Sequence, residues 1–356
     1  MFRDLFAERR EKLRPLLARA DLAALLVSFD ANRYYLSGFE LHDTQMDESS
    51  GRLIIRPDGK DLLCTDSRFA DAAARVWDKE RIFVYKNDGL EQINALLKDT
   101  VSGKIGFEAG HVSVQAFASL GDGLDMEQAD GLVESLRMIK SPEEILLLEK
   151  SCRLNHRLMQ WLPGVLEPGR SEMEISWEVE KFFREHGAEE MAFPSIVAVN
   201  GNSALPHARP GRDPLADGCC LLVDTGCRLE AYCSDQTRTF RVGDNPDPLF
   251  PADLDMVREA QELAIARLRP GAHAAEIYRL ARSFLDEKGV GALFTHGLGH
   301  GIGLQTHEAP GLNPNSRQVL RPGMVLTVEP GIYRPGQYGV RWEYMVLITE
   351  DGARVL

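Results

Sequence analysis

The sequence of 356 residues is long enough for two domains, and 44% of its residues are hydrophobic, as expected for a chain with a buried core. Acidic side chains outnumber basic ones by 54 to 41, so the formal net charge is −13. That balance argues against a nucleic-acid-binding surface, which needs a basic face, and against adsorption to anionic lipid. The N-terminus lacks the apolar core of a signal peptide, so we expect a cytoplasmic protein.

Helical and strand-like segments alternate over the first third of the chain, which is typical of an α/β domain. We place this domain at residues 1–135. The predicted elements are helices over residues 3–19, 68–77, 90–97 and 112–120, and strands over residues 23–29, 52–55, 62–64, 82–85 and 104–107. This part of the chain contains no glycine-rich phosphate loop, and its acidic and histidine residues do not cluster as metal ligands would.

Two helix-start motifs open the second domain, which we place at residues 136–356. Residues 141–144 and 171–174 each have a serine followed three residues later by a glutamate, the spacing of a capping box. Two more helices are predicted over residues 253–269 and 274–288, each closed by proline or glycine. Predicted hairpins make up the rest, so this domain is expected to be α+β.

The first pair of candidate functional carboxylates lies on one of these hairpins. An apolar run ends at Asp224, the chain turns after Gly226, and a second β-prone run brings back Asp235. A hairpin centred between Leu229 and Glu230 would place the two aspartates opposite each other, with Cβ atoms roughly 5 Å apart. Carboxylates that close need a cation, a proton or a basic group between them. Two solvated aspartates at strand ends are the alternative.

Two histidines lie in a segment where every second residue is glycine. His296 and His300 belong to residues 295–304, and the alternating glycines disfavour the helix on which an H-E-x-x-H zinc motif depends. Alternating glycine instead favours an extended segment that another part of the chain approaches closely. A single histidine is more often structural, but two in such a segment favour metal ligation.

A second predicted hairpin carries two more carboxylates. A strand over residues 324–328 ends at Glu329, and its return strand over residues 340–348 contains Glu343, which is costly to bury without a partner. Arg341 offers an ordinary ion-pair partner. Four carboxylates and an imidazole also suit two divalent ions, and such an oxygen-rich donor set favours manganese, cobalt or zinc. Zinc–thiolate binding is disfavoured because the six cysteines form no C-x-x-C pair.

These segments resemble the metallopeptidase family of Xaa-Pro aminopeptidases, prolidases and methionine aminopeptidases, which has the pita-bread fold. The residues that match the family's metal ligands are Asp224 in D-x-G, Asp235 in S-D-x-T-R-T, His300 in G-H-G-x-G, Glu329 in T-x-E-P-G and Glu343 in R-x-E. Residues 33–39 and 138–144 resemble the creatinase-type N-terminal domain and its linker. The resemblance thus implies an α/β creatinase-like domain followed by an α+β pita-bread catalytic domain.

The resemblance implies a dinuclear metal-dependent exopeptidase that hydrolyses the X–Pro bond at the N-terminus of short peptides, as an Xaa-Pro aminopeptidase does. An Xaa-Pro dipeptidase, or prolidase, is the alternative within the family. Manganese is the metal expected first, with cobalt or zinc next, and a homodimer is implied. Two other classes stay open, a catalytically silent peptide-binding module on the same fold and a creatinase-like hydrolase that works without metal, although both would be expected to lose ligands.

Each matched residue has an implied role. Asp224 holds one metal ion, His300 and Glu329 favour the other, and Asp235 and Glu343 bridge both. The ions activate a water molecule for attack on the carbonyl before proline.

Glu329 is also the expected proton shuttle, and His307 with His207 is expected to stabilise the developing oxyanion. His296 matches a substrate-binding position, and Arg341 matches an arginine near the bridging glutamate. The sequence departs from the family pattern at Trp342 and Tyr344, which flank Glu343 and put the surroundings of that ligand in question.

Overall fold

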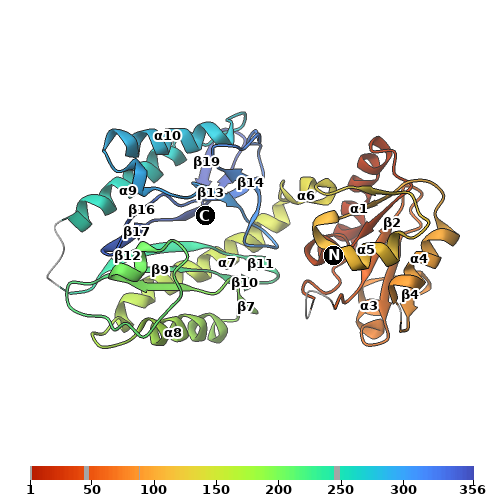
Figure 1. Ribbon diagram of the computed structural model, residues 1–356, viewed down its shortest axis with the longest axis horizontal. Helices are drawn as coiled ribbons and strands as arrows, with labels where there is room; N and C mark the ends of the chain where they lie inside the picture. The colour runs from red at the N-terminus through yellow and green to blue at the C-terminus, as the bar shows by residue number, and fades with distance from the viewer. Residues whose placement is uncertain (1, 44–47, 88, 244–248) are drawn as a thin grey trace. The chain divides into compact units, whose positions relative to one another are not determined.

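The computed structural model describes residues 2–43, 48–87, 89–243 and 249–356 (Figure 1). The chain divides into two compact units, an N-terminal unit Met1–Arg137 and a C-terminal unit Met138–Leu356. No helix in the described ranges combines the length and the apolar composition needed to cross a membrane. All six cysteines are buried and have free thiols.

The N-terminal unit is built on a mixed six-stranded sheet with the order β4-β3-β2-β1-β5-β6. Its strands are β1 Ala24–Val27, β2 Arg52–Ile55, β3 Leu62–Asp66, β4 Ile82–Tyr85, β5 Ile105–Phe107 and β6 Met126–Gln128. Its helices are α1 Phe2–Arg19, α2 Asp30–Ser37, α3 Ala70–Val76, α4 Gly89–Thr100, α5 Val114–Gly121 and α6 Leu132–Arg137. The predicted alternation is confirmed, and α2, α6 and β6 are additional to the predicted elements.

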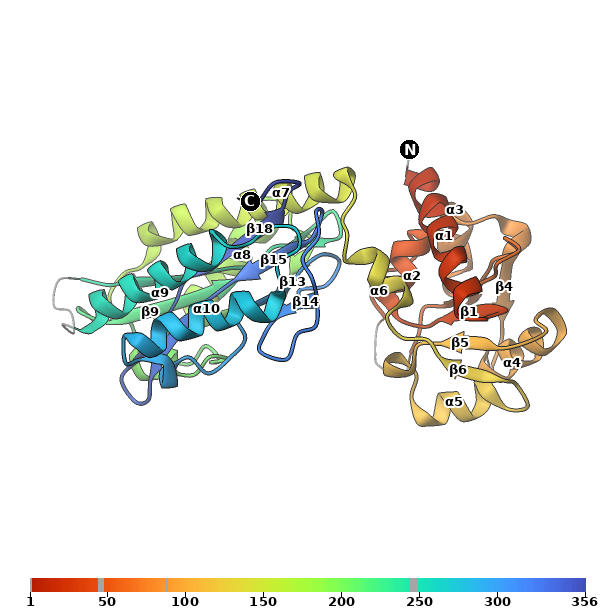
Figure 2. The same cartoon turned by 90° about the horizontal axis from the view of Figure 1, so that it is seen from above.

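In the C-terminal unit, strands lie between two pairs of helices. The helices are α7 Pro142–Trp161, α8 Glu172–Glu185, α9 Leu249–Ile265 and α10 Ala274–Glu287. Helices α7 and α8 lie on one side of the strands and α9 and α10 on the other (Figures 1 and 2). Both predicted capping boxes are present, with Ser141 and Ser171 each accepting the N–H of the glutamate three residues later.

In the described part of this unit, the strands between these helices form four small sheets. The sheet orders are β12-β9-β8, β11-β10-β7, β14-β13-β15-β18-β19 and β16-β17. The first two sheets contain β7 Glu190–Met191, β8 Ile196–Val199, β9 Cys220–Thr225, β10 Cys227–Leu229, β11 Tyr232–Cys233 and β12 Gln236–Arg241. The other two contain β13 Gly299–Gly301, β14 Glu308–Leu312, β15 Val325–Val328, β16 Gly331–Arg334, β17 Tyr338–Arg341, β18 Tyr344–Ile348 and β19 Ala353–Val355.

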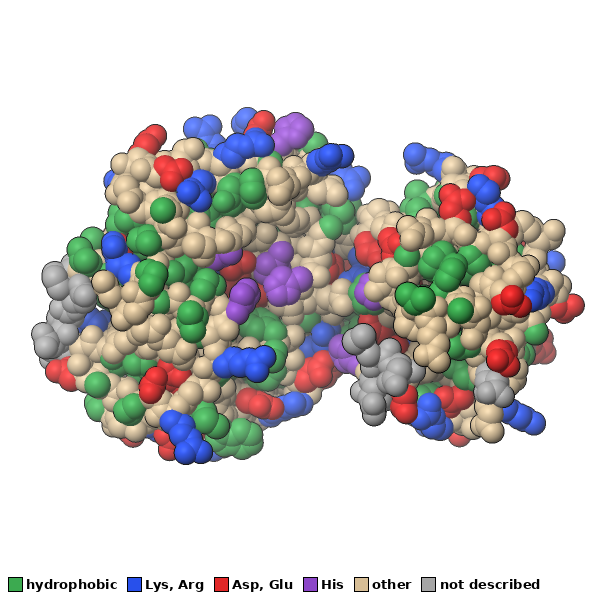
Figure 3. All heavy atoms as spheres, viewed as in Figure 1, with side chains coloured by type: hydrophobic (Ala, Val, Ile, Leu, Met, Phe, Trp, Pro, Cys, Tyr) green, Lys and Arg blue, Asp and Glu red, His purple; other side chains and the backbone are tan. Residues whose placement is uncertain are grey.

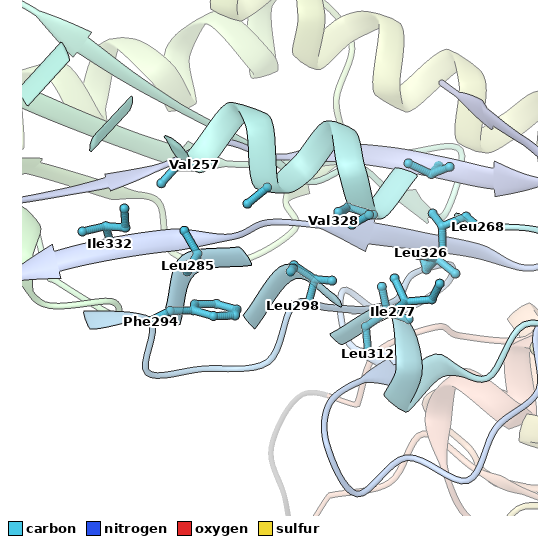
Figure 4. Close-up of a cluster of buried hydrophobic side chains, with 14 of the residues drawn as sticks. Val257, Leu268, Ile277, Leu285, Phe294, Leu298, Leu312, Leu326, Val328 and Ile332 are labelled. Atoms are coloured by element: carbon cyan, nitrogen blue, oxygen red, sulfur yellow. The ribbon is translucent and has the colours of Figure 1, made fainter. Parts of the chain in front are cut away.

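An apolar core fixes the strands that carry the candidate site. Val257 of α9 and Leu285 of α10 belong to one buried cluster with Val328 of β15 and Ile332 of β16 (Figure 4). All four side chains are fully buried, and fully burying such a side chain contributes about 1.5–3 kcal/mol. The strand ends next to Glu329 are therefore held by side chains that are not free to shift.

The register of the first hairpin differs from the predicted one. Leu229 pairs with Tyr232, and Asp224 pairs with Thr237 rather than with Asp235. The turn residues between the paired positions both have positive φ, 48° at Glu230 and 73° at Ala231, as in a type I′ turn. The centre of the hairpin therefore lies one residue later than predicted, between Glu230 and Ala231, and the partner of each strand residue lies two residues later than predicted.

The two aspartates nevertheless point to one face of the hairpin. Asp235 precedes Thr237 by two positions, and residues two apart on an extended chain share a face. Asp235 is thus a diagonal neighbour of Asp224, a relation that separates two residues by about 7–8 Å, with their Cβ atoms somewhat closer. Gly226 permits the approach here, because a Cβ at this position would lie 1.8 Å from the carbonyl oxygen of Ser234.

The second hairpin is interrupted where its two carboxylates lie. Val328 pairs with Tyr344 and Gly331 with Arg341, so the return strand that was predicted over residues 340–348 is two strands, β17 and β18. Glu329 and Glu343 both fall in the gap between the two ladders. Proline at position 330 has no N–H to donate, which explains why the ladder breaks at this point.

Candidate metal centre

One cavity of the C-terminal unit, about 410 Å³ in volume, is lined by every candidate site residue. These residues are Asp224, Asp235, His300, Glu329, Glu343, His207, His296, His307 and Arg341. Figure 3 shows histidine side chains gathered in a hollow on this face of the unit, with acidic side chains visible beside them. The chain segments from position 207 to position 343 thus converge on one site.

The donor atoms face one another within metal-binding reach. Asp235, His300 and Glu343 each offer one atom, and these atoms lie within 4.8 Å of one another. The Nε2 atom of His300 is also 3.4 Å from the Glu329 carboxylate and 3.6 Å from Asp235 Oδ2. These separations suit groups arranged around a shared cation better than groups hydrogen-bonded to each other.

The backbone prepares His300 as a ligand. Its Nδ1 atom lies 3.0 Å from the carbonyl oxygen of Gly301, which can only accept a hydrogen bond. The proton of the neutral ring therefore sits on Nδ1, and Nε2 presents its lone pair to the carboxylates. Glycine is required on both sides, because a Cβ at Gly299 or Gly301 would lie 2.0 Å or 2.2 Å from a neighbouring carbonyl oxygen. The predicted close approach of the backbone is confirmed.

Arg341 occupies one oxygen of Asp224 and leaves the other unpartnered. Its Nη2 donates to Asp224 Oδ2 at 2.5 Å, while Asp224 Oδ1 is buried and has no hydrogen-bond partner among the described residues. The same guanidinium donates to Thr237, Tyr333 and the carbonyl of Pro206. Asp224 is thus oriented on one side and keeps a free oxygen on the other, as a metal ligand requires.

Burial and mutual repulsion act on the carboxyl groups together. The pKa of Asp235 is raised well above its ordinary value by burial and then by the neighbouring charges of Glu343 and Asp224. The pKa of Glu343 is raised by burial and by Glu329. Burial raises the pKa of Glu329 to about 7, although Arg341 opposes this shift. A divalent cation would relieve the repulsion that raises these values.

A relay of hydrogen bonds joins His296 to Arg341 through Tyr333, a residue that the sequence analysis missed. His296 Nδ1 lies 2.7 Å from the carbonyl oxygen of Gly297, so it carries the proton and Nε2 accepts from the Tyr333 hydroxyl at 2.8 Å. That hydroxyl in turn accepts from Arg341 at 2.7 Å. Burial and the nearby Arg341 lower the pKa of His296 to about 4, which keeps the ring neutral.

His207 and His307 lie at the open side of the cavity, and both are exposed. The ring of His307 is 4.2 Å from that of His300, measured between centroids. Partial burial and the neighbouring His300 lower the pKa of His307 to about 4. A neutral imidazole at this place is able to donate an N–H to a group inside the cavity.

Trp342 and Tyr344, which flank Glu343 in the sequence, have their rings against the guanidinium of Arg238. The guanidinium carbon of Arg238 lies 4.3 Å from the Trp342 ring centroid and 4.2 Å from that of Tyr344. Arg238 also donates to the carbonyl oxygens of Thr237 and Glu343, each at 2.7 Å. The two aromatic residues therefore support the backbone of Glu343 through a cation–π sandwich.

Buried carboxylates, an orphaned carboxylate oxygen and an imidazole with a free Nε2 together form the donor set of a divalent-metal centre. Thiolates play no part, since all six cysteines are free and the cavity lining includes none of them. The fold and the site thus define a metal-dependent protein with an α/β unit followed by an α+β unit that carries the centre.

Comparison with known proteins identifies the family. Residues 147–350 match the model of Metallopeptidase family M24, and residues 9–139 match that of the Creatinase/Prolidase N-terminal domain. The chain belongs to metallopeptidase family M24. The resemblance inferred from the sequence is therefore confirmed, as is the prediction of a metal-dependent peptidase.

Relatives of known structure share the whole architecture. The chain is 32% identical to the Xaa-Pro dipeptidase of Pyrococcus furiosus, over 98% of this chain and 97% of that protein. The structure of an Xaa-Pro dipeptidase from Bacillus anthracis superposes with a TM-score of 0.91 at 32% identity, covering 98% and 97% of the two chains. An X-Pro aminopeptidase from Thermotoga maritima superposes with a TM-score of 0.82 at 30% identity, covering 94% and 95%. The predicted creatinase-like and pita-bread architecture is confirmed.

Proposed function

We propose that this chain is a proline-specific exopeptidase that holds two divalent metal ions in the cavity of its C-terminal unit. The observation that carries the proposal is the convergence of four carboxylates and His300 on one cavity. Asp224 would hold one ion, His300 and Glu329 would favour the other, and Asp235 and Glu343 would bridge both. The intact set of donors argues against a silent binding module and against a metal-free hydrolase.

Bound divalent ions would polarise the substrate carbonyl and supply an activated water molecule at neutral pH. Side chains of the protein would transfer protons, stabilise the oxyanion and position the metal ligands. Glu329 lines the cavity, 3.4 Å from His300 Nε2, and is suited by this position to hold and release a proton during the reaction. The neutral ring of His307, together with His207, would donate N–H groups to the oxyanion, and the His296–Tyr333–Arg341 relay would hold Asp224 in place.

Oxygen-rich ligation with a single imidazole supports manganese as the metal, with cobalt or zinc as alternatives. We also propose a homodimer, which rests on the family resemblance. Among the described residues of the cavity wall, Phe193, Pro194 and Ile196 provide an apolar surface against which a proline ring could pack.

We propose Xaa-Pro dipeptidase activity as the specific function. It is supported by the P. furiosus and B. anthracis proteins, both named Xaa-Pro dipeptidases, to which the chain is 32% identical. Xaa-Pro aminopeptidase activity is the second candidate, favoured by the T. maritima structure. Either enzyme must recognise a substrate whose scissile nitrogen has no hydrogen, since proline forms a tertiary amide.

A series of peptides of increasing length tests this proposal. The manganese-loaded protein is expected to hydrolyse Gly-Pro faster than Gly-Pro-Ala or longer peptides, and not to hydrolyse Gly-Ala. Product release measured by chromatography under identical conditions gives the comparison. Rates that rise with peptide length would assign the aminopeptidase function instead, and the absence of X–Pro cleavage from every peptide would refute both.

Metal affinity is expected to rise with pH. The pKa of Glu329 is about 7 and the pKa values of Asp235 and Glu343 are raised, so these groups hold protons that a metal ion must displace. We expect affinity to increase roughly tenfold per pH unit for each displaced proton between about pH 6 and pH 8. Calorimetric titration of Mn²⁺ in two buffers with different ionisation enthalpies would count the protons. An affinity independent of pH would contradict the raised pKa values.

A further inference from the structure

Arg209 is a basic side chain of the cavity wall with a free guanidinium. It lines the same cavity as the four carboxylates and is exposed, and no ion pair between described residues includes it. Exposed arginines are common on any surface, so the position alone assigns no role. Its surroundings do assign one, because the hydrogen-bond donors of Arg341, the other arginine that lines this cavity, are already occupied.

Arg341 cannot take a further anionic partner. It is buried, and its guanidinium donates to Asp224, Tyr333, Thr237 and the carbonyl oxygen of Pro206 at 2.5–3.1 Å. A ligand carboxylate would have to displace the buried Asp224 pair to reach it, which would leave that carboxylate uncompensated. Within the described cavity lining, Arg209 is therefore the arginine available to an incoming anion.

The loop that carries Arg209 is held in place by a buried carboxylate at the start of α8. Glu172 is fully buried and accepts from the backbone N–H groups of Val199 and Gly211 at 2.6 Å and 2.5 Å. It also accepts from the side chain of Asn202, whose amide donates in addition to the carbonyl oxygen of Arg209 at 3.2 Å. These bonds fix both ends of the loop, so the Arg209 backbone is ordered while its guanidinium remains free.

We propose that Arg209 is a specificity-determining residue that binds the C-terminal carboxylate of a free dipeptide. This inference rests on the proposed X–Pro peptidase function and names the substrate class of the same site. A planar guanidinium suits a carboxylate because it can donate two parallel N–H bonds. The cavity volume of about 410 Å³ lies within the range of small-ligand sites and accommodates a dipeptide.

The position of Arg209 also fits the charge of the site. Four carboxylates occupy the inner part of the cavity, so a second negative charge on the substrate needs a cation elsewhere on the wall. Arg209 lies on the same loop as His207, and we expect the His207 side chain to face the scissile carbonyl. A dipeptide that spans these residues would present its free carboxylate to Arg209, whereas a longer peptide has a neutral amide at that place.

Arg209→Gln tests this assignment when it is assayed with Gly-Pro and Gly-Pro amide, which differ in the terminal charge. With the manganese-loaded enzyme, we expect KM for Gly-Pro to rise about tenfold to a hundredfold, the range for a lost charge-assisted hydrogen bond. Hydrolysis of the amide should change less than about twofold, because it has no carboxylate to lose. Arg209→Lys should recover part of the loss, since lysine keeps the charge but not the paired donors.

Arg212→Gln is the matched control, because Arg212 is exposed, follows on the same segment and does not line the cavity. It should leave both substrates unaffected. Equal losses for Gly-Pro and its amide in Arg209→Gln, or no loss for either, would overturn the assignment while X–Pro hydrolysis by the wild-type protein still supported the proposed function. If the wild-type protein cleaves no X–Pro bond, both proposals fail together.

Discussion

Asp235→Asn is expected to lower kcat for Gly-Pro by about a thousandfold or more. Asp235 is buried, lies within 4.8 Å of donor atoms from His300 and Glu343, and is proposed to bridge both ions. Metal polarisation contributes several kcal/mol to catalysis of this kind, and each 1.4 kcal/mol is about a factor of ten in rate. The asparagine amide has nearly the shape of the aspartate carboxylate, but it offers the metal a weak neutral ligand in place of a charged one. Steady-state kinetics at saturating Mn²⁺ would measure the loss.

A readout independent of activity separates loss of metal from loss of fold. Without metal, the variant should melt at or above the temperature of the wild-type protein, because one of four crowded carboxylates is gone. Metal at about a hundred times its dissociation constant adds about 2.7 kcal/mol to a folded protein that binds it, and the variant should lose most of that gain. Asp255→Asn, at an exposed position of α9, is the control. Full activity in Asp235→Asn would refute the ligand assignment.

Arg341→Met is expected to have the largest effect on the stability of the metal-free protein, about 3–5 kcal/mol. The guanidinium is 3% exposed and forms the 2.5 Å ion pair with Asp224, so its removal leaves that carboxylate buried without a counter-charge. Urea unfolding of the metal-free protein would measure the change. Added Mn²⁺ should restore much of the lost stability, because the ions would then neutralise Asp224.

Arg334→Met provides a matched comparison outside the site. Arg334 pairs with the buried Asp253 at 2.5 Å, but neither residue lines the cavity. Its loss should also destabilise the protein, and added metal should restore no more stability than it adds to the wild-type protein. Equal responses of the two variants to Mn²⁺ would show that Arg341 acts only as a structural ion pair.

Much of the site was predictable because its residues terminate apolar runs. Asp224 lies near the end of β9, after the apolar run 220–223, and Glu329 directly follows the buried strand β15, so the β-strand pattern of the sequence places both near strand ends. The alternating glycines around His300 indicate close packing of the backbone, which the structure shows at Gly299 and Gly301. These signals are local, so they can be read from the sequence without knowing which strands pair.

The register of the first hairpin could not be predicted, because no local sequence signal marks the position of its turn. Its turn residues, Glu230 and Ala231, have positive φ values, yet neither is the asparagine or glycine that normally marks such a turn. The predicted pairing of Asp224 with Asp235 was therefore wrong by two residues. The prediction that the two side chains point to the same face was still correct, because a shift of two positions preserves the alternation of side chains along a strand.

Long-range contacts account for what the sequence did not reveal. Tyr333 enters the site through bonds to Arg341, on the paired strand β17, and to His296, on a separate segment of the chain. Trp342 and Tyr344 both stack on Arg238, a residue more than a hundred positions earlier. No periodicity or local motif carries such pairings, since they exist only after the strands have packed together.

The most direct test of the account is the number of divalent ions bound per chain. Elemental analysis after equilibration with Mn²⁺ and removal of free metal should give two ions for the wild-type protein. Glu343→Gln, which alters a proposed bridging ligand, should bind fewer than two ions under the same conditions. A wild-type protein that binds no metal, or a variant that keeps both ions at wild-type affinity, would contradict the claim that these side chains form the metal centre.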